Sequence, residues 1–170
     1  MKKTTLCYIS VGDKLLMLHR TKKKNDENAE KYIGLGGHFL PGETPLQCVR
    51  REVSEESGLL PDDYAYRGVV HFSSDIYDDE EMHLFTASVP EAARFADCDE
   101  GDLCLISEND LLSLKMWEGD LIFLSLLFYG ADFFDLSLVY RGEKLISAEL
   151  NGQELDLSDL PRKYGSKKNT

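Results

Sequence analysis

Short apolar runs separated by polar turns make up most of the chain, and this pattern predicts a domain rich in β-strands. The apolar residues of 4–10 and 14–20 flank turn residues 11–13, so we expect a hairpin there. A second hairpin is expected over 133–150, with its turn at residues 141–142. Four further strands are expected at residues 32–37, 64–75, 82–89 and 103–107.

Polar and acidic stretches at 21–31 and 75–81 interrupt these runs, and we expect both to be exposed loops. Residues 108–114 and 119–130 are predicted to be helical from their length and composition. The longest apolar run, 121–129, lies inside the second of these segments. Nine residues are too few to cross a bilayer, so we expect this run to be buried in the core.

The clearest helix signals lie in residues 44–58. Thr44 suits the N-cap, Pro45 suits the first helical position, and Gln47 completes a capping box with Thr44. Gly58 suits the left-handed residue that follows the last turn of a helix. The segment is therefore predicted to be a helix with well-marked ends.

Length and composition indicate a globular protein with one main unit. The 170 residues and the apolar fraction of 42% predict a single domain over 1–156, followed by a flexible tail at 157–170. The net charge of -12 argues against duplex nucleic acid as a partner, because binding phosphates requires a basic surface. The same charge is compatible with a well-solvated surface or with a protein that binds cations.

The cysteines and histidines give no sign of a zinc site. The four cysteines form no CxxC pair, and the four histidines are dispersed along the chain. Free cysteines in this number indicate a reducing, cytoplasmic location. The first residues are too polar for a signal peptide, so no membrane association is expected.

Three glutamates, Glu52, Glu55 and Glu56, lie within five positions of the predicted helix. At 100° per residue they share one arc beside the apolar face, where their like charges repel. A solvated acidic face is one interpretation. However, Glu55 and Glu56 lie near the helix C-terminus, where negative charge opposes the helix dipole. A bound hard cation such as Mg²⁺ would remove this repulsion, which favours a metal site.

A glycine-rich loop precedes this helix and supports the same interpretation. Gly34, Gly36 and Gly37 let backbone atoms approach a ligand closely, although tight turns alone also explain them. Glu43 and Arg51 are eight residues apart, and we expect a salt bridge between them to hold the loop against the helix.

The spacing of these residues resembles the signature of the Nudix hydrolases. That signature reads Gly, five residues, Glu, seven residues, then Arg-Glu-aliphatic-any-Glu-Glu-any-Gly-aliphatic. No position departs from it. The matching residues are Gly37, Glu43, Arg51, Glu52, Val53, Glu55, Glu56, Gly58 and Leu59. The resemblance implies an α+β fold, an α/β/α sandwich around a central mixed sheet with the signature as a loop–helix–loop.

The resemblance also implies a metal-dependent hydrolase of nucleoside diphosphates linked to another group. Mg²⁺, for which Mn²⁺ can substitute, would be held by Glu52, Glu55, Glu56 and the Gly37 carbonyl, with Glu43 and Arg51 as a structural pair. In the MutT/MutX-like branch, to which CDEGDL (98–103) and KMWEGDLIF (115–123) are similar, a distant glutamate completes the site. Glu100 matches that position. The general base is left open between Glu56, Glu55 and Glu100.

This branch hydrolyses oxidised purine nucleoside triphosphates such as 8-oxo-dGTP, which suggests roles for five more residues. By the resemblance Trp117 would stack on the base and Asp120 would bond to its edge, although a core position and a helix N-cap are the structural alternatives. Phe72 would line the pocket or belong to the core. Arg20 and Lys23 would meet the phosphates, although Lys23 is also a candidate for simple solvation.

Ile33 marks a departure from the eukaryotic members of the branch, which read the base with an asparagine at this place. An isoleucine can neither donate nor accept a hydrogen bond. Other substrates therefore stay open: an ordinary dNTP, a nucleotide sugar or a dinucleoside polyphosphate. A silent module that senses a nucleotide is a further alternative, against which the intact glutamates count. The expected partner is a small nucleotide, and the expected state is a monomer or homodimer.

Overall fold

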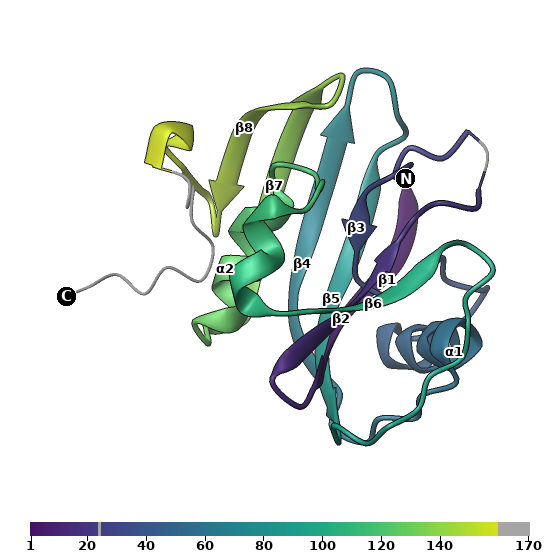
Figure 1. Cartoon of the computed structure of the whole chain (residues 1–170). Coiled ribbons are helices and arrows are strands. Elements are labelled where there is room, and N and C mark those ends of the chain that lie inside the picture. The colour runs from purple at the N-terminus through teal and green to yellow at the C-terminus, as the bar shows by residue number, and fades with distance from the viewer. Residues whose placement is uncertain (24, 160–170) are drawn as a thin grey trace.

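The computed structural model describes residues 1–23 and 25–159, which form a mixed β-sheet with a helix on each face (Figure 1). Its strands are β1 Lys2–Val11, β2 Lys14–His19, β3 Tyr32–Ile33, β4 Ala65–Ser74, β5 Glu80–Val89, β6 Asp102–Ile106, β7 Phe134–Arg141, β8 Lys144–Leu150 and β9 Gln153–Glu154. Its helices are α1 Pro45–Ser57 and α2 Asp120–Phe128, with short 3-10 helices η1 Glu108–Ser113 and η2 Leu157–Asp159.

The sheet order is β3-β2-β1-β5-β4-β7-β8-β9, and β6 pairs with β2 off this path. The pairs β1–β5 and β4–β7 are parallel, and the other pairs are antiparallel. A mixed sheet of this kind needs helical or looped crossovers between its parallel neighbours, and these crossovers carry α1 and α2. The predicted fold class, an α/β/α sandwich around a central mixed sheet, is confirmed.

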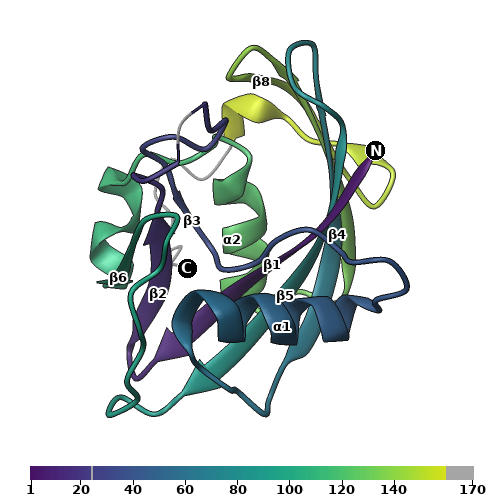
Figure 2. The ribbon, with the colours of Figure 1, turned by 90° about the vertical axis from the view of Figure 1, so that its right-hand side faces the viewer.

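The alternation of side chains along β1 divides the core between the two faces of the sheet. Cys7 and Ile9 belong to the cluster that includes Val49 and Val53 of α1. Tyr8, between them in sequence, belongs to the opposite cluster, which contains most of the apolar residues of α2. Successive residues of a strand point to opposite faces, so one strand contributes to both cores. Figure 2 shows α1 and α2 on either side of this strand.

Most predicted elements are present, with differences at five places. The helix predicted at 108–114 is a 3-10 helix over Glu108–Ser113, and the predicted strand at 32–37 is a strand only over its first two residues. The run 121–129 is buried along one side only, and Tyr129 is 60% exposed. The acidic loop predicted at 75–81 is shorter, because Glu80 and Glu81 begin β5.

The loop predicted at 21–31 is the largest difference. It was expected to be exposed throughout, but Lys31 is only 4% exposed. Its ammonium group donates to the Glu143 carboxylate at 2.9 Å and to the Glu27 carbonyl at 3.3 Å, which satisfies the buried charge. The loop is therefore folded back onto the molecule rather than solvated on all sides.

The end of the chain is described only in part. Of the predicted flexible tail at 157–170, residues 160–170 lie outside the described residues. Its first three residues form η2, and Leu157 packs against the cluster around α2. Within 1–23 and 25–159, none of the helices has both the length and the apolar character that crossing a membrane requires.

Candidate active site

Helix α1 has the ends that its sequence predicts. The Thr44 hydroxyl accepts a hydrogen bond from the Gln47 backbone N–H, and the Gln47 side chain accepts one from the Thr44 N–H. Gly58 ends the helix with a φ of 73°. Val49 and Val53 are buried against the sheet, which sets the rotation of α1 about its axis. The acidic arc therefore faces the loop that precedes the helix.

That loop runs along β1 and leaves no room for larger side chains. The Thr5 N–H donates to the Gly37 carbonyl at 2.9 Å. A Cβ on Gly36 would overlap the Thr5 carbonyl, and one on Gly37 would lie 2.6 Å from the Glu52 carboxylate oxygens. Glycine is required at position 36, because the clash there is with the backbone of β1, while a side chain at position 37 would displace the movable end of Glu52.

Arg51 forms ion pairs with three glutamates on the outer side of this loop. Its guanidinium donates to Glu43 at 2.6 and 3.0 Å, to Glu52 at 2.7 Å and to Glu55 at 3.3 Å. The expected Glu43–Arg51 ion pair is therefore present. These hydrogen bonds lower the pKa of Glu43 to about 2, with Arg51 as the main cause. A further bond to the His38 carbonyl at 2.9 Å ties the loop to the helix.

Glu56 lies on the inner side of the same helix and is buried. Its carboxylate accepts a hydrogen bond from the Gly36 N–H at 3.2 Å. Burial raises the pKa of Glu56 to about 8, and the negative charges of Glu100 and Glu52 add to the shift. The carboxyl group is therefore protonated at neutral pH unless positive charge is brought to it.

Glu100 reaches the site from the segment before β6. Its carboxylate accepts from the Arg20 guanidinium at 2.6 Å, and its backbone carbonyl accepts from the Lys22 N–H at 3.2 Å. The next residue, Gly101, packs so closely that an added Cβ would overlap the His19 carbonyl of β2. This contact with β2 places Glu100 opposite α1.

The donor set fits a hard divalent cation. Glu52, Glu56, Glu100 and the Gly37 carbonyl offer only oxygen atoms, the ligands that Mg²⁺ and Mn²⁺ prefer. Part of the raised pKa of Glu56 comes from the other two carboxylates, which is the repulsion that a cation would relieve. Among the described residues no three acidic, histidine or cysteine side chains are already grouped as a metal site. Arginines hold the carboxylates instead: Arg51 binds Glu52, and Arg20 binds Glu100.

Glu55 differs from the other predicted ligands. Its side chain is 59% exposed and lies on the outer side of α1, against Arg51. The structure therefore places Glu52 and Glu100 near enough to Glu56 for their charges to raise its pKa, and it leaves Glu55 on the outer side of α1.

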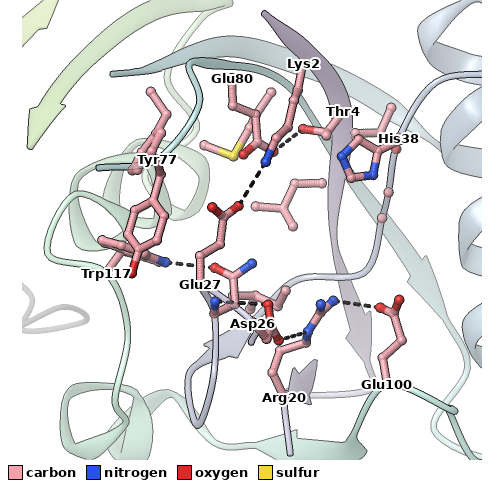
Figure 3. Close-up of a pocket in the computed structure, with 18 of the residues that line it drawn as sticks. Lys2, Thr4, Arg20, Asp26, Glu27, His38, Tyr77, Glu80, Glu100 and Trp117 are labelled. Carbon is pink, nitrogen blue, oxygen red and sulfur yellow. Dashed lines mark hydrogen bonds and ion pairs between the residues drawn. The ribbon is translucent and has the colours of Figure 1, made fainter. Parts of the chain in front are cut away.

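One cavity of about 500 Å³ contains eight of the predicted site residues. These are Gly37, Glu52 and Glu100 at the acidic end, and Arg20, Lys23, Phe72, Trp117 and Asp120 beyond them. Glu43, Arg51, Glu55 and Glu56 do not line it. Segments far apart in the sequence thus enclose one space, with Glu100 on one side of it and Tyr77 and Trp117 on the other (Figure 3).

Trp117 forms the aromatic end and belongs both to the core and to the cavity wall, so the two interpretations of its role are compatible. It is 7% exposed, and its ring packs edge-to-face against Phe72, Tyr77 and Tyr140 with centroids 5.1 to 6.0 Å apart. The Lys31 ammonium lies 4.4 Å from its ring centroid, a cation–π contact. These neighbours hold the ring in one orientation.

Asp120 lies at the first position of α2 and lines the cavity, although it is only 6% exposed. The alternative role of Asp120 as the N-cap is wrong, because Gly119 occupies the N-cap position of α2. Burial raises the pKa of Asp120 to about 8, while Lys31 lowers it and Glu80 raises it. At neutral pH the group is a carboxylic acid, which can donate as well as accept a hydrogen bond.

Arg20 and Lys23 lie on the remaining wall. Arg20 is buried between two carboxylates, because its Nε donates to Asp26 at 2.7 Å and its Nη1 donates to Glu100 at 2.6 Å. The Lys23 side chain is exposed at the cavity edge. Arg20 is thus a fixed positive charge beside the acidic end, and Lys23 is a solvated one.

The family model for the NUDIX domain matches residues 2–127 of this chain. The chain belongs to the Nudix family. Its signature helix is α1, and the glycine loop and Glu100 surround the acidic end of the cavity.

Two curated proteins are similar in sequence to this Nudix chain. The oxidized purine nucleoside triphosphate hydrolase of Danio rerio is 33% identical over 107 residues, which cover 62% of this chain and 67% of the relative. The isopentenyl-diphosphate Delta-isomerase of Corynebacterium diphtheriae is 33% identical over 108 residues, 56% of this chain and 57% of the isomerase. The chain thus spans little more than half the length of that relative.

A solved structure shows the same fold. The mutator MutT protein from Bacillus halodurans superposes with a TM-score of 0.77 at 21% identity, covering 90% of this chain and 99% of that one. The chain is therefore a MutT-like member of the Nudix family in its fold.

Two polar residues of the Nudix cavity, Glu80 and Asn28, have no recognisable signal in the sequence. Glu80 points inward from β5 and accepts from the Thr4 hydroxyl at 2.7 Å, and burial raises its pKa. Asn28 lines the cavity from the loop that was expected to be exposed, and its Oδ1 accepts from the Trp117 indole N–H at 2.8 Å. Only long-range packing reveals these two, because each occurs in a locally polar stretch.

Proposed function

We propose that this Nudix protein hydrolyses oxidised purine nucleoside triphosphates, such as 8-oxo-dGTP, to the monophosphate and pyrophosphate. One observation carries the proposal: the acidic end of the cavity opens into the same space as Trp117 and the buried Asp120. A nucleotide has the same two chemical ends, a charged phosphate chain and a flat base. The Danio rerio relative, an oxidized purine nucleoside triphosphate hydrolase, supports the same substrate class.

At the acidic end, Glu52, Glu56 and Glu100 with the Gly37 carbonyl would hold Mg²⁺ or Mn²⁺. When bound, such ions neutralise phosphate charge and lower the pKa of coordinated water. Arg20 is buried beside these carboxylates and supplies positive charge to the phosphate chain. Lys23 adds charge at the edge of the cavity. Of the three candidate bases, Glu56 and Glu100 are better placed than Glu55, which faces solvent.

At the aromatic end, the Trp117 ring would stack on the base, and Asp120 would bond to its edge. Stacking is tolerant of base identity, so the polar groups must supply the selectivity. A protonated Asp120 can donate to a carbonyl and accept from an N–H, and both groups occur on an oxopurine. Phe72 fixes the plane of Trp117 and closes the space beside it.

A second candidate is hydrolysis of another nucleoside diphosphate derivative, and Ile33 favours it. This residue lines the cavity and offers no hydrogen bond, so it removes one contact to the base. Ordinary dNTPs, nucleotide sugars and dinucleoside polyphosphates would fit the acidic end equally well. We further propose a cytoplasmic protein with one domain over 1–156, acting as a monomer or homodimer.

The test is a release assay with a nucleotide panel. Purified protein is incubated with 8-oxo-dGTP, dGTP, dATP, ADP-ribose and a dinucleoside polyphosphate, with Mg²⁺, with Mn²⁺ or with chelator. Pyrophosphate from the triphosphates is converted to phosphate by a pyrophosphatase and measured colorimetrically. ADP-ribose and the dinucleoside polyphosphate yield phosphomonoesters instead, so their products are treated with alkaline phosphatase before the same measurement. We expect metal-dependent release, with kcat/KM for 8-oxo-dGTP about tenfold or more above that for dGTP. No release from any triphosphate with either metal would show that the proposal is wrong.

A further inference from the structure

The segment 26–28 connects the two ends of the cavity through hydrogen bonds (Figure 3). Asp26 accepts from the Arg20 Nε at 2.7 Å through Oδ2 and from the Asn28 N–H at 3.1 Å through Oδ1. Asn28 in turn accepts from Trp117 at 2.8 Å. Because the Asp26 side chain is buried and both its oxygens are engaged, the position of Asn28 is fixed relative to the cavity.

The contact with Trp117 also fixes which way the Asn28 amide points. An indole N–H can only donate, so the atom facing it must be the carbonyl oxygen, and the amide nitrogen lies on the other side. That nitrogen carries two N–H donors, and within residues 1–23 and 25–159 neither of them meets an acceptor. The residue is half-buried and lines the cavity.

The other polar groups around Asn28 are already engaged. The Asp26 carboxylate binds Arg20, and Glu27 lies 3.5 Å from the Lys2 ammonium. The Asn28 amide is therefore a neutral donor left available beside the stacking ring. A donor pair at this place favours a carbonyl oxygen over an amino group on a bound base.

We infer that Asn28 is a specificity-determining residue, whose amide donates to a carbonyl oxygen of the base that stacks against Trp117. The inference rests on the proposed function, and it deepens that function by naming the group that is recognised. Guanine and 8-oxoguanine carry a carbonyl at position 6, where adenine carries an amino group. Asn28 therefore discriminates in favour of guanine-type bases.

The test is Asn28→Asp, which keeps an oxygen for the Trp117 indole and removes both amide donors. Because Trp117 is the only tryptophan, quenching of its fluorescence reports nucleotide binding at this ring directly. We expect the ratio of affinities for 8-oxo-dGTP over dATP to fall about tenfold, as the loss of one hydrogen bond in a desolvated site predicts. The same ratio of kcat/KM should fall in the release assay.

Asn25→Asp is the matched control for charge, because it adds the same negative charge to the same loop and Asn25 also lines the cavity. Added charge repels every triphosphate, so this variant should weaken all nucleotides alike and leave the ratio unchanged. Asn28→Leu removes the oxygen as well, and it should change the Trp117 emission spectrum, which Asn28→Asp should preserve.

The outcomes separate the inference from the proposed function. If the wild type binds nucleotides without hydrolysing them, the proposed function is wrong, and the binding ratio still tests Asn28. An unchanged ratio in Asn28→Asp with an intact Trp117 spectrum would overturn the inference and leave Asn28 as a support for the ring. Failure of the wild type to bind any nucleotide would overturn both.

Discussion

The two ends of the cavity are built in different ways. The acidic end comes almost entirely from one continuous stretch, the glycine loop and α1, to which Glu100 is added from a distance. The aromatic end is assembled from three separate parts of the sequence, which supply Asn28, Phe72, and Trp117 with Asp120. Local sequence therefore specifies the chemistry of the first end, while the whole fold specifies the second.

The two ends also differ in how their charges are satisfied. At the acidic end Arg51 and Arg20 pair with several carboxylates, so charge is compensated by charge. At the aromatic end Asp120 is buried and makes no salt bridge with any of the residues 1–23 and 25–159, and burial raises its pKa to about 8. Substitutions at the acidic end should therefore change mainly kcat, while substitutions at the aromatic end should change mainly KM or the pH dependence of stability.

The largest effect is expected for Glu56→Gln, because glutamine has the shape of the glutamate side chain but cannot carry its negative charge. If the acidic end holds the metal, kcat should fall by roughly 10²- to 10⁴-fold, because a ligand and a candidate base are lost together. Steady-state pyrophosphate release measures this. Glu154→Gln on β9 is the control, since that residue is exposed and does not line the cavity. Activity at the wild-type level in Glu56→Gln would remove the basis for the metal site.

Trp117→Ala should act on KM more than on kcat. Loss of one stacking contact predicts a rise in KM of about 10- to 100-fold, from about 1–3 kcal/mol per stacked base. Circular dichroism and thermal melting must accompany the kinetics, because Trp117 also belongs to the core. Trp117→Phe keeps an aromatic face and should recover part of the affinity. An unfolded Trp117→Ala, with a Trp117→Phe protein that binds as tightly as wild type, would favour a purely structural role.

Asp120→Asn tests the buried acid through the pH dependence of stability. The pKa of Asp120 is raised to about 8 in the folded state, so the folded protein keeps a proton that the unfolded chain has already lost above pH 4. Wild-type stability is thus lost progressively between about pH 4 and pH 8. Asp120→Asn should match the wild type near pH 4 and exceed it at pH 8 by on the order of 1 kcal/mol or more. If the difference in unfolding free energy between Asp120→Asn and the wild type is the same at pH 4 and pH 8, Asp120 is not protonated in the folded state.

The smallest effect is expected for Lys31→Met, which removes the cation from the Trp117 ring and keeps an apolar stem. We expect KM to rise about two- to fivefold with kcat unchanged, the size of one partly buried cation–π contact. Glu143→Gln removes only the partner of Lys31 and should change KM less. An equal effect of the two variants would indicate that the ion pair, rather than the cation over the ring, matters.

The sequence predicts most of the fold, because strands and caps depend on local patterns. Thr44, Gln47 and Gly58 set the ends of α1 through contacts within a few residues, and these predictions are confirmed. The expected Glu43–Arg51 ion pair is local as well, since it spans one loop and two helical turns. Lys31 shows where such reasoning fails, because its burial depends on Trp117 and Glu143, more than eighty residues away in the sequence.

The roles of the site residues stay predictions, and the sequence indicates them unevenly. Glu52 and Glu56 are identified by spacing, and the structure brings both to the glycine loop. Asn28 and Glu80 occur in polar stretches typical of solvated loops, and only the packing of β1, β5 and the 115–120 segment turns them inward. Hydrophobic patterning cannot reveal a polar residue that faces an internal cavity.

The close approach of Gly101 to the His19 carbonyl has a consequence for how this protein could lose its activity. Any larger residue at 101 would push the preceding segment off β2, and it would carry Glu100 away from the other carboxylates. Every residue of the signature would be untouched by that change. If Glu100 completes the metal site as we propose, a descendant of this chain could keep a perfect motif and a binding pocket and yet have no hydrolase activity, which inspection of the motif alone would not reveal.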